Sequence, residues 1–105
     1  MNQHSAVAVV PTKMASRYLQ QLAKHWSHNL TVEFTPTDGT INFPKHVRGK
    51  SFPADATVTL RAREGALEVL VDASAPEQLD GLKGAVASHL DRFAFREAPL
   101  QFDWR

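Results

Sequence analysis

Residues 57–73 read TVTLRAREGALEVLVDA, two runs of alternating apolar and polar side chains on either side of Glu64-Gly65. A period of two is typical of strands that bury one face, and glycine between two such runs is typical of a hairpin turn. The spacing therefore predicts strands over 57–62 and 67–73. The buried face carries Val58, Leu60, Leu67, Val69 and Val71, whereas Arg61 and Arg63 point to the other face.

The neighbouring segments predict further strands. Residues 31–34 and 40–43 alternate in the same way around Asp38-Gly39, and Asp-Gly between such runs is a strong hairpin signal. Residues 44–53 are bounded by prolines and predict a loop between the two hairpins. A first strand is expected over 6–10, ended by Pro11, and a last one over 100–104. The expected inward residues of the first hairpin are Val32, Phe34, Ile41 and Phe43.

Two other segments have apolar residues at helical spacing. Residues 13–28 are expected to form a helix that Thr12 caps, with a basic outer face. A second helix is expected over 75–93, where Ser74 and Glu77 match the capping box that satisfies backbone N–H groups reciprocally. The apolar stripes contain Met14, Ala15, Tyr18, Leu19, Leu22 and Trp26 in the first helix, and Leu79, Leu82, Val86, Leu90 and Phe93 in the second.

These elements predict a single α+β domain over residues 1–105, in the order β-α-ββ-ββ-α-β. Helices with one apolar stripe and strands with one apolar face are buried together when both helices cover one face of a largely antiparallel sheet. We therefore expect a two-layer sandwich. A ferredoxin-like relative with an added hairpin is one possible arrangement of the strands.

The composition restricts the function. The chain has 105 residues, 43% of them hydrophobic, with no cysteine and a formal net charge of +1. The lack of cysteine excludes disulfides, thiol nucleophiles and cysteine metal ligands. The low net charge argues against nucleic-acid binding, and the apolar run over residues 6–10 is too short for a membrane span or a signal peptide. We expect a cytoplasmic protein that binds neither nucleic acid nor membrane.

The charge is distributed unevenly. Residues 1–50 carry six basic and two acidic side chains, a surplus of +4, whereas residues 51–105 carry six basic and nine acidic ones, a surplus of −3. Two faces of one solvated domain would account for this asymmetry. An anion-binding surface or electrostatically guided self-association would account for it as well, so both a monomer and a homodimer stay open.

Three histidines are candidate ligand-binding residues. His25 lies seven residues after Tyr18, and His89 has the same kind of position in the second helix, so both fall within apolar stripes. They could be buried, neutral core residues whose rings approach each other or a polar neighbour such as Arg92. They could instead line a polar site that binds a metal or a small ligand. His28 adds an imidazole three residues after His25, but a HxxH pair alone does not predict a metal site.

Two basic clusters are candidate anion-binding sites. The second helix ends in RFAFRE, whose two arginines could form an ion network with Glu97 or hold an anionic ligand. The loop of residues 44–53 could bind phosphate or carboxylate, although solvated connections often have such a composition. The candidates are Arg92 and Arg96 at the helix end, and Lys45, Arg48 and Lys50 in the loop.

Parts of the chain resemble a known family. The segments 15–28 (ASRYLQQLAKHWSH) and 89–97 (HLDRFAFRE), with Val10-Pro-Thr12 and Asp38-Gly39-Thr40, resemble a family of small bacterial proteins described as a domain of unknown function. The resemblance spans essentially the whole chain, apart from the long basic loop. Related domains also occur joined to siderophore-interacting flavoproteins, so the resemblance implies an accessory role in iron handling. It supplies no catalytic residue.

Two classes of function follow. The first is a non-enzymatic accessory or binding module with no cofactor, whose partner is a small anionic ligand or a siderophore-interacting flavoprotein. The second is a small enzyme or a metal- or cofactor-binding protein that uses His25, His28 and His89. The first is favoured because the sequence contains no recognisable pair of nucleophile and base.

Overall fold

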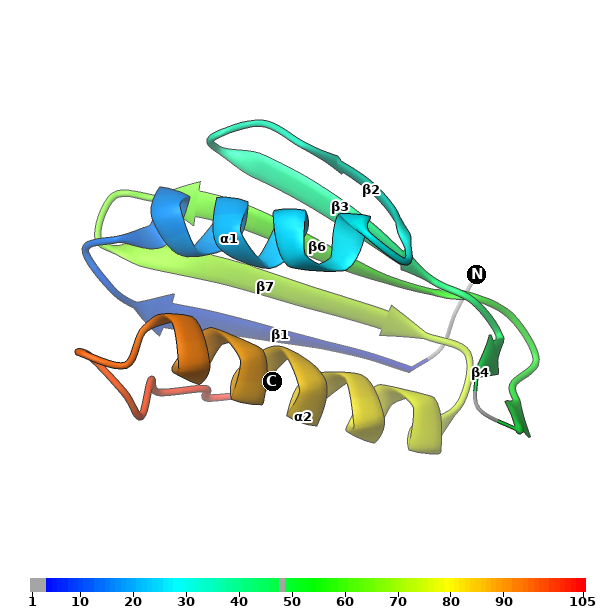
Figure 1. The fold of residues 1–105 in the computed structure, drawn as a ribbon. Coiled ribbons are helices and arrows are strands. Elements are labelled where there is room, and N and C mark those ends of the chain that lie inside the picture. The colour runs from blue at the N-terminus through cyan, green and yellow to red at the C-terminus, as the bar shows by residue number, and fades with distance from the viewer. Residues whose placement is uncertain (1–3, 48) are drawn as a thin grey trace.

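The computed structural model describes residues 4–47 and 49–105. It contains a five-stranded sheet, a two-stranded ribbon and two helices (Figure 1). The elements are β1 (His4–Pro11), α1 (Ala15–Ser27), β2 (Thr31–Phe34), β3 (Asp38–Phe43), β4 (His46–Val47), β5 (Lys50–Ser51), β6 (Ala56–Arg63), β7 (Ala66–Ala73) and α2 (Pro76–Phe93).

The five-stranded sheet has the order β1-β7-β6-β3-β2, and every neighbouring pair is antiparallel. Both helices lie on the same face of this sheet and run in opposite directions (Figure 1). The predicted α+β fold with two layers is confirmed. The ferredoxin-like arrangement is wrong, because its split βαβ units need parallel strands and this sheet has none among the described residues.

The strand register builds the core. Ala8 lies opposite Val69, which lies opposite Leu60, so one row of apolar side chains crosses three strands beneath the helices. Helix α1 packs on β2, β3, β6 and β7, whereas α2 packs on β7 and β1. The fully buried large side chains come from all of these layers: Val10, Leu19, Leu22, Ile41, Val58, Leu60, Leu67, Val69, Val71, Val86 and Leu90.

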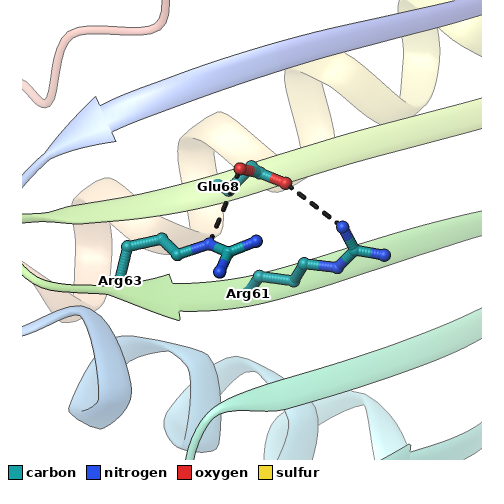
Figure 2. A network of polar contacts seen from close by, with 3 residues as sticks. All are labelled: Arg61, Arg63 and Glu68. Atoms are coloured by element: carbon teal, nitrogen blue, oxygen red, sulfur yellow. Dashed lines mark ion pairs between the residues drawn. The ribbon is translucent and has the colours of Figure 1, made fainter.

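The other face of the sheet is covered by neither of the two described helices (Figure 1). The guanidinium groups of Arg61 and Arg63 flank the Glu68 carboxylate there, with N–O distances of 3.6 and 3.8 Å (Figure 2). All three side chains are partly or largely exposed, so these ion pairs contribute little stability. Val9 on the same face is 55% exposed.

The expected last strand is not formed as a strand. Residues 100–105 run beside β1 and make one reciprocal backbone pair, in which the N–H groups of Val7 and Arg105 each donate to the other's carbonyl at 2.9 Å. The alternation holds: Leu100 is buried, and Phe102 and Trp104 pack against the core. The Asp91 carboxylate accepts the N–H of Leu100 and fixes this tail to α2.

The long loop and the first helix also differ in detail from the predictions. The segment 44–53 contains the short ribbon β4–β5, and Phe34 is 36% exposed at the edge of the sheet. Helix α1 begins two residues later than expected, with Met14 at the N-cap. The Thr12 hydroxyl still accepts the N–H of Met14, at 3.1 Å, just before the helix.

The predicted capping box at α2 is wrong. The N-cap is Ala75 and makes no side-chain cap, because the helix begins one residue later than the box requires. The amide oxygen of Gln78 accepts the backbone N–H of Ser74 at 2.7 Å, and the Gln78 amide nitrogen donates to the carbonyl of Ala54. Gln78 is buried, so this network joins the helix start to the segment before β6.

Within the described residues, neither helix has the length and apolar character needed to cross a membrane.

Candidate functional site

The candidate residues meet along the seam between the two helices. Tyr18, Gln21 and His25 follow one another at spacings of three and four on α1, so they lie on one helix face. His89 and Phe93 are four residues apart on α2, and Phe93 lies edge-on to His25 with ring centroids 5.9 Å apart. We call this strip, formed by Tyr18, Gln21, His25, His89 and Phe93, the interhelical seam.

His25 and His89 meet directly. Their ring centroids are 5.0 Å apart, and the Trp26 ring lies 5.0 Å from that of His89. The expected approach of the two imidazoles is confirmed. Their expected burial is wrong, because His25 is exposed and His89 is only half-buried. Both side chains lie at the outer edge of the helix stripes, where the seam opens to solvent.

The surroundings of the pair are electropositive. Desolvation by packing lowers the pKa of His25, and the nearby His89, Arg92 and His28 lower this pKa further. The Nδ1 atom of His89 lies 2.6 Å from the carbonyl oxygen of Ala85 in the preceding turn. Because a carbonyl oxygen can only accept, Nδ1 carries the proton of the neutral ring and donates it, which leaves Nε2 as the acceptor atom of the ring.

The histidines do not gather with other potential metal ligands in the described residues. His28 is exposed at the C-cap of α1. Among residues 4–47 and 49–105, no three histidine, aspartate or glutamate side chains converge as metal ligands. Zinc sites use three or four protein ligands, and the pair of His25 and His89 supplies only two.

A cleft of about 340 Å³ opens at the other end of the seam. The Tyr18 hydroxyl donates to the Glu97 carboxylate at 3.0 Å, and the Thr12 hydroxyl donates to the same oxygen at 3.1 Å. The Arg96 guanidinium lies over the ring of Phe95, which is 72% exposed. The cleft is lined by Met14, Arg17, Tyr18, Phe93, Phe95, Arg96 and Glu97.

Tyr18 is held in its protonated form. Burial raises the pKa of its hydroxyl, and the Glu97 carboxylate raises this pKa further through its hydrogen bond and its charge. The buried phenol is therefore a fixed hydrogen-bond donor. It positions Glu97 between helix α1 and the turn that follows α2.

The proposed ion network at the end of α2 is not formed. Glu97 accepts from Tyr18 and Thr12, and no ion pair links it to Arg92 or Arg96 among the described residues. Arg96 instead lines the cleft, and Arg92 lies near His25. The two candidate arginines thus belong to opposite ends of the interhelical seam.

The basic loop is separate from the seam. Arg48 lies outside the described residues, and Lys45 and Lys50 are exposed. The Asp55 carboxylate accepts the backbone N–H of Lys45 at 2.8 Å and the Asn42 amide at 3.3 Å, and these bonds lower the pKa of Asp55. An ionised carboxylate beside Lys45 repels an incoming anion, so the structure does not favour anion binding here.

A wider depression of about 500 Å³ runs along α1, but residues 13–24 alone line it, so it has no opposite wall. Gln21 lies at its border with the seam. The Gln21 amide oxygen is buried and has no hydrogen-bond partner among the described residues. A buried acceptor without a donor costs about 1–3 kcal/mol, which makes Gln21 the one unsatisfied polar group of the seam in the described part of the chain.

Sequence reasoning missed the cleft residues Thr12, Arg17 and Glu97 as partners of Tyr18. Thr12 and Glu97 are 85 positions apart, so only the folded chain brings them together. One signal was present for Arg17: it lies in the first turn of α1, which contains no acidic residue. A cation there opposes the helix dipole, so stability does not explain its position.

The fold and the seam define a small two-layer α+β domain with an open cleft between its helices. The chain belongs to the bacterial family described as "Uncharacterized protein conserved in bacteria (DUF2218)", whose model matches residues 7–105. It is similar to PA4090 from Pseudomonas aeruginosa, a protein solved by NMR, with 28% identity and a TM-score of 0.75. That alignment covers 96% of this chain and 94% of PA4090. No curated protein matches the chain.

Proposed function

We propose that this protein is a non-enzymatic binding module that acts in the cytoplasm and holds a small anionic ligand in the cleft around Tyr18. The observation that carries the proposal is the composition of the cleft. Arg17 and Arg96 supply two guanidinium groups, and Met14, Phe93 and Phe95 supply an apolar wall. Guanidinium groups bind carboxylates and phosphates through paired hydrogen bonds, and the apolar wall suits a flat hydrocarbon portion.

The polar groups of the cleft favour binding over catalysis. Tyr18 keeps its proton because its pKa is raised, so it is a poor general base. The negative charge of Glu97 opposes an anion, but two hydroxyl donors already hold its Oε1 atom, and the two arginines outnumber it in the cleft. Within the described residues, no serine or threonine hydroxyl is hydrogen-bonded to a histidine, so no activated nucleophile supports the enzyme alternative.

The ligand class is linked to iron by the family resemblance. Many ferric siderophore complexes are anionic and carry apolar groups, which matches the lining of the cleft. A volume of about 340 Å³ is at the small end of ligand sites, so such a complex would insert one anionic arm rather than its whole bulk. A siderophore-interacting flavoprotein is the partner that this role implies.

The test is a binding titration of the full chain with benzoate, salicylate and a panel of ferric siderophores. Tryptophan fluorescence is the signal that reports binding. Arg96→Gln should weaken binding by about 10- to 150-fold, because a charge-assisted hydrogen bond contributes about 1.5–3 kcal/mol. Arg61→Gln is the matched control, since Arg61 lies on the opposite face of the sheet and outside the cleft around Tyr18. The proposal is wrong if no probe binds the wild type, or if both variants bind as the wild type does.

A further inference from the structure

We propose that His25, His89 and Arg92 form a second site on the interhelical seam, which binds an oxyanion when the imidazoles are protonated. The charged groups of this site differ from those of the cleft around Tyr18, although Phe93 packs beside both, and the site does not depend on the function proposed for that cleft. The ligand class is a sulfate, phosphate or carboxylate group, alone or as part of a larger molecule.

The geometry places the donors together at an open surface. The imidazole centroids are 5.0 Å apart, and they come from two different helices. Trp26 and Phe93 pack against the rings and hold them in place, at centroid distances of 5.0 Å from His89 and 5.9 Å from His25. His25 is exposed, so an ion reaches the pair from solvent without any movement of the core.

The charges around the pair are almost entirely positive. Helix α1 contributes Lys24 and His28, and helix α2 contributes Arg92. The one acidic neighbour on α2, Asp91, accepts the N–H of Leu100 in the C-terminal tail. From the sheet, the neighbouring side chain is that of Phe43, whose ring packs against Trp26 and has no charge. Glu97, beyond Phe93, is engaged by Tyr18 and Thr12.

Protonation of both imidazoles therefore creates a cluster of positive charges that no ion pair neutralises in the described residues. When both rings are charged, two cations lie side by side next to Arg92, and no carboxylate of the described residues forms an ion pair with them. An oxyanion at the solvent-facing edge of the two rings would accept N–H bonds from both and offset this repulsion. Proton and anion binding are consequently linked, and each raises the affinity for the other by the same factor.

The ring of His89 is already oriented for anion binding when no ligand is bound. Its Nδ1–H is directed at the carbonyl of Ala85, which fixes the tilt of the ring. The proton gained at lower pH must then enter at Nε2, the atom that has no partner in the described structure. Protonation adds a donor at this position without disturbing the helix.

The experiment uses sulfate as the probe, because its charge stays constant where histidine titrates. NMR titration of all five histidine rings, with and without sulfate, reports each pKa separately. Sodium chloride at equal ionic strength provides the reference for screening. If sulfate binds the protonated pair about tenfold more tightly than the neutral pair, saturation raises the apparent pKa values of His25 and His89 by about one unit in total, shared between the two rings.

His4 and His46 serve as internal controls, because they lie on β1 and β4, away from the seam. In the matched variants, Arg92→Gln should reduce the sulfate effect on His25 and His89, whereas Arg63→Gln on the opposite face of the sheet should not. The proposal is overturned if all five histidines respond equally, or if sulfate has no more effect than chloride. Both outcomes are independent of whether benzoate or a siderophore binds near Tyr18.

Discussion

At the scale of single residues, Tyr18 offers the most direct measurement, because it is the one tyrosine in the chain. Absorbance of the tyrosinate therefore reports this side chain alone. Burial and Glu97 should raise its midpoint above the ordinary value of 10.0. Glu97→Gln should bring the midpoint closer to 10.0, since the variant removes a negative charge but leaves the phenol buried.

The same titration has a consequence for stability. The folded protein holds the Tyr18 proton more tightly than the unfolded chain does. The resulting stabilisation is present below the unfolded pKa of about 10 and is lost as the pH rises through the folded pKa. Denaturant unfolding at alkaline pH should show this loss in the wild type and a smaller loss in Glu97→Gln. A wild-type midpoint at or below the ordinary value would contradict the assigned surroundings of Tyr18.

The residues of the cleft also explain why the site could be predicted only in part. The helical spacing placed Tyr18 and His25 on one face of α1, because the period of a helix is a local property. The partners of Tyr18 depend on the path of the chain after α2, where Ala94–Pro99 turns back toward Thr12. No local pattern encodes that return, so the sequence predicts only an ion network of Glu97 with the neighbouring arginines, or an anionic ligand held by those arginines.

At the scale of elements, the start of α2 shows how a one-residue offset changes an assignment. Ser74 and Glu77 have the spacing of a capping box, but the helix begins at Pro76, a residue favoured in the first turn. The third helical residue is then Gln78, which reaches back to the N–H of Ser74. The sequence predicted the position of the helix but not which side chain would close its first turn.

This network predicts unequal effects for two neighbouring residues. Gln78→Ala removes a buried amide and leaves the N–H of Ser74 and the carbonyl of Ala54 with fewer partners, so it should destabilise the protein by about 1–3 kcal/mol. Glu77→Ala, at an exposed position in the same turn, should change stability by less than about 0.5 kcal/mol. Urea unfolding of both variants makes the comparison. Equal destabilisation by the two variants would contradict the role assigned to Gln78 and support the predicted capping by Glu77.

At the scale of the whole molecule, the two edges of the sheet are protected by different means. Strand β2 forms one edge and has only four residues, so it offers little backbone for pairing with another chain. Strand β1 forms the other edge, has eight residues and carries the exposed Val7 and Val9 on its open face. The C-terminal tail lies along this longer edge, where Arg105 pairs with Val7.

Removal of Trp104 and Arg105 should therefore cause self-association. The shortened chain keeps the buried Leu100 and its bond to Asp91. The N–H and C=O groups of Val7 lose their partners, however, on an edge strand where Val7 and Val9 are exposed. Such an edge is a template for intermolecular strand pairing, so sedimentation velocity should show a larger species whose fraction rises with concentration. Arg105→Ala is the matched control, because it keeps the backbone pair and should sediment as the full chain does. If the shortened chain also sediments like the full chain at every concentration, the tail does not protect the edge of β1 from self-association. The contact of Lys83 on α2 with the ring of Trp104 would then be the interaction that holds the tail.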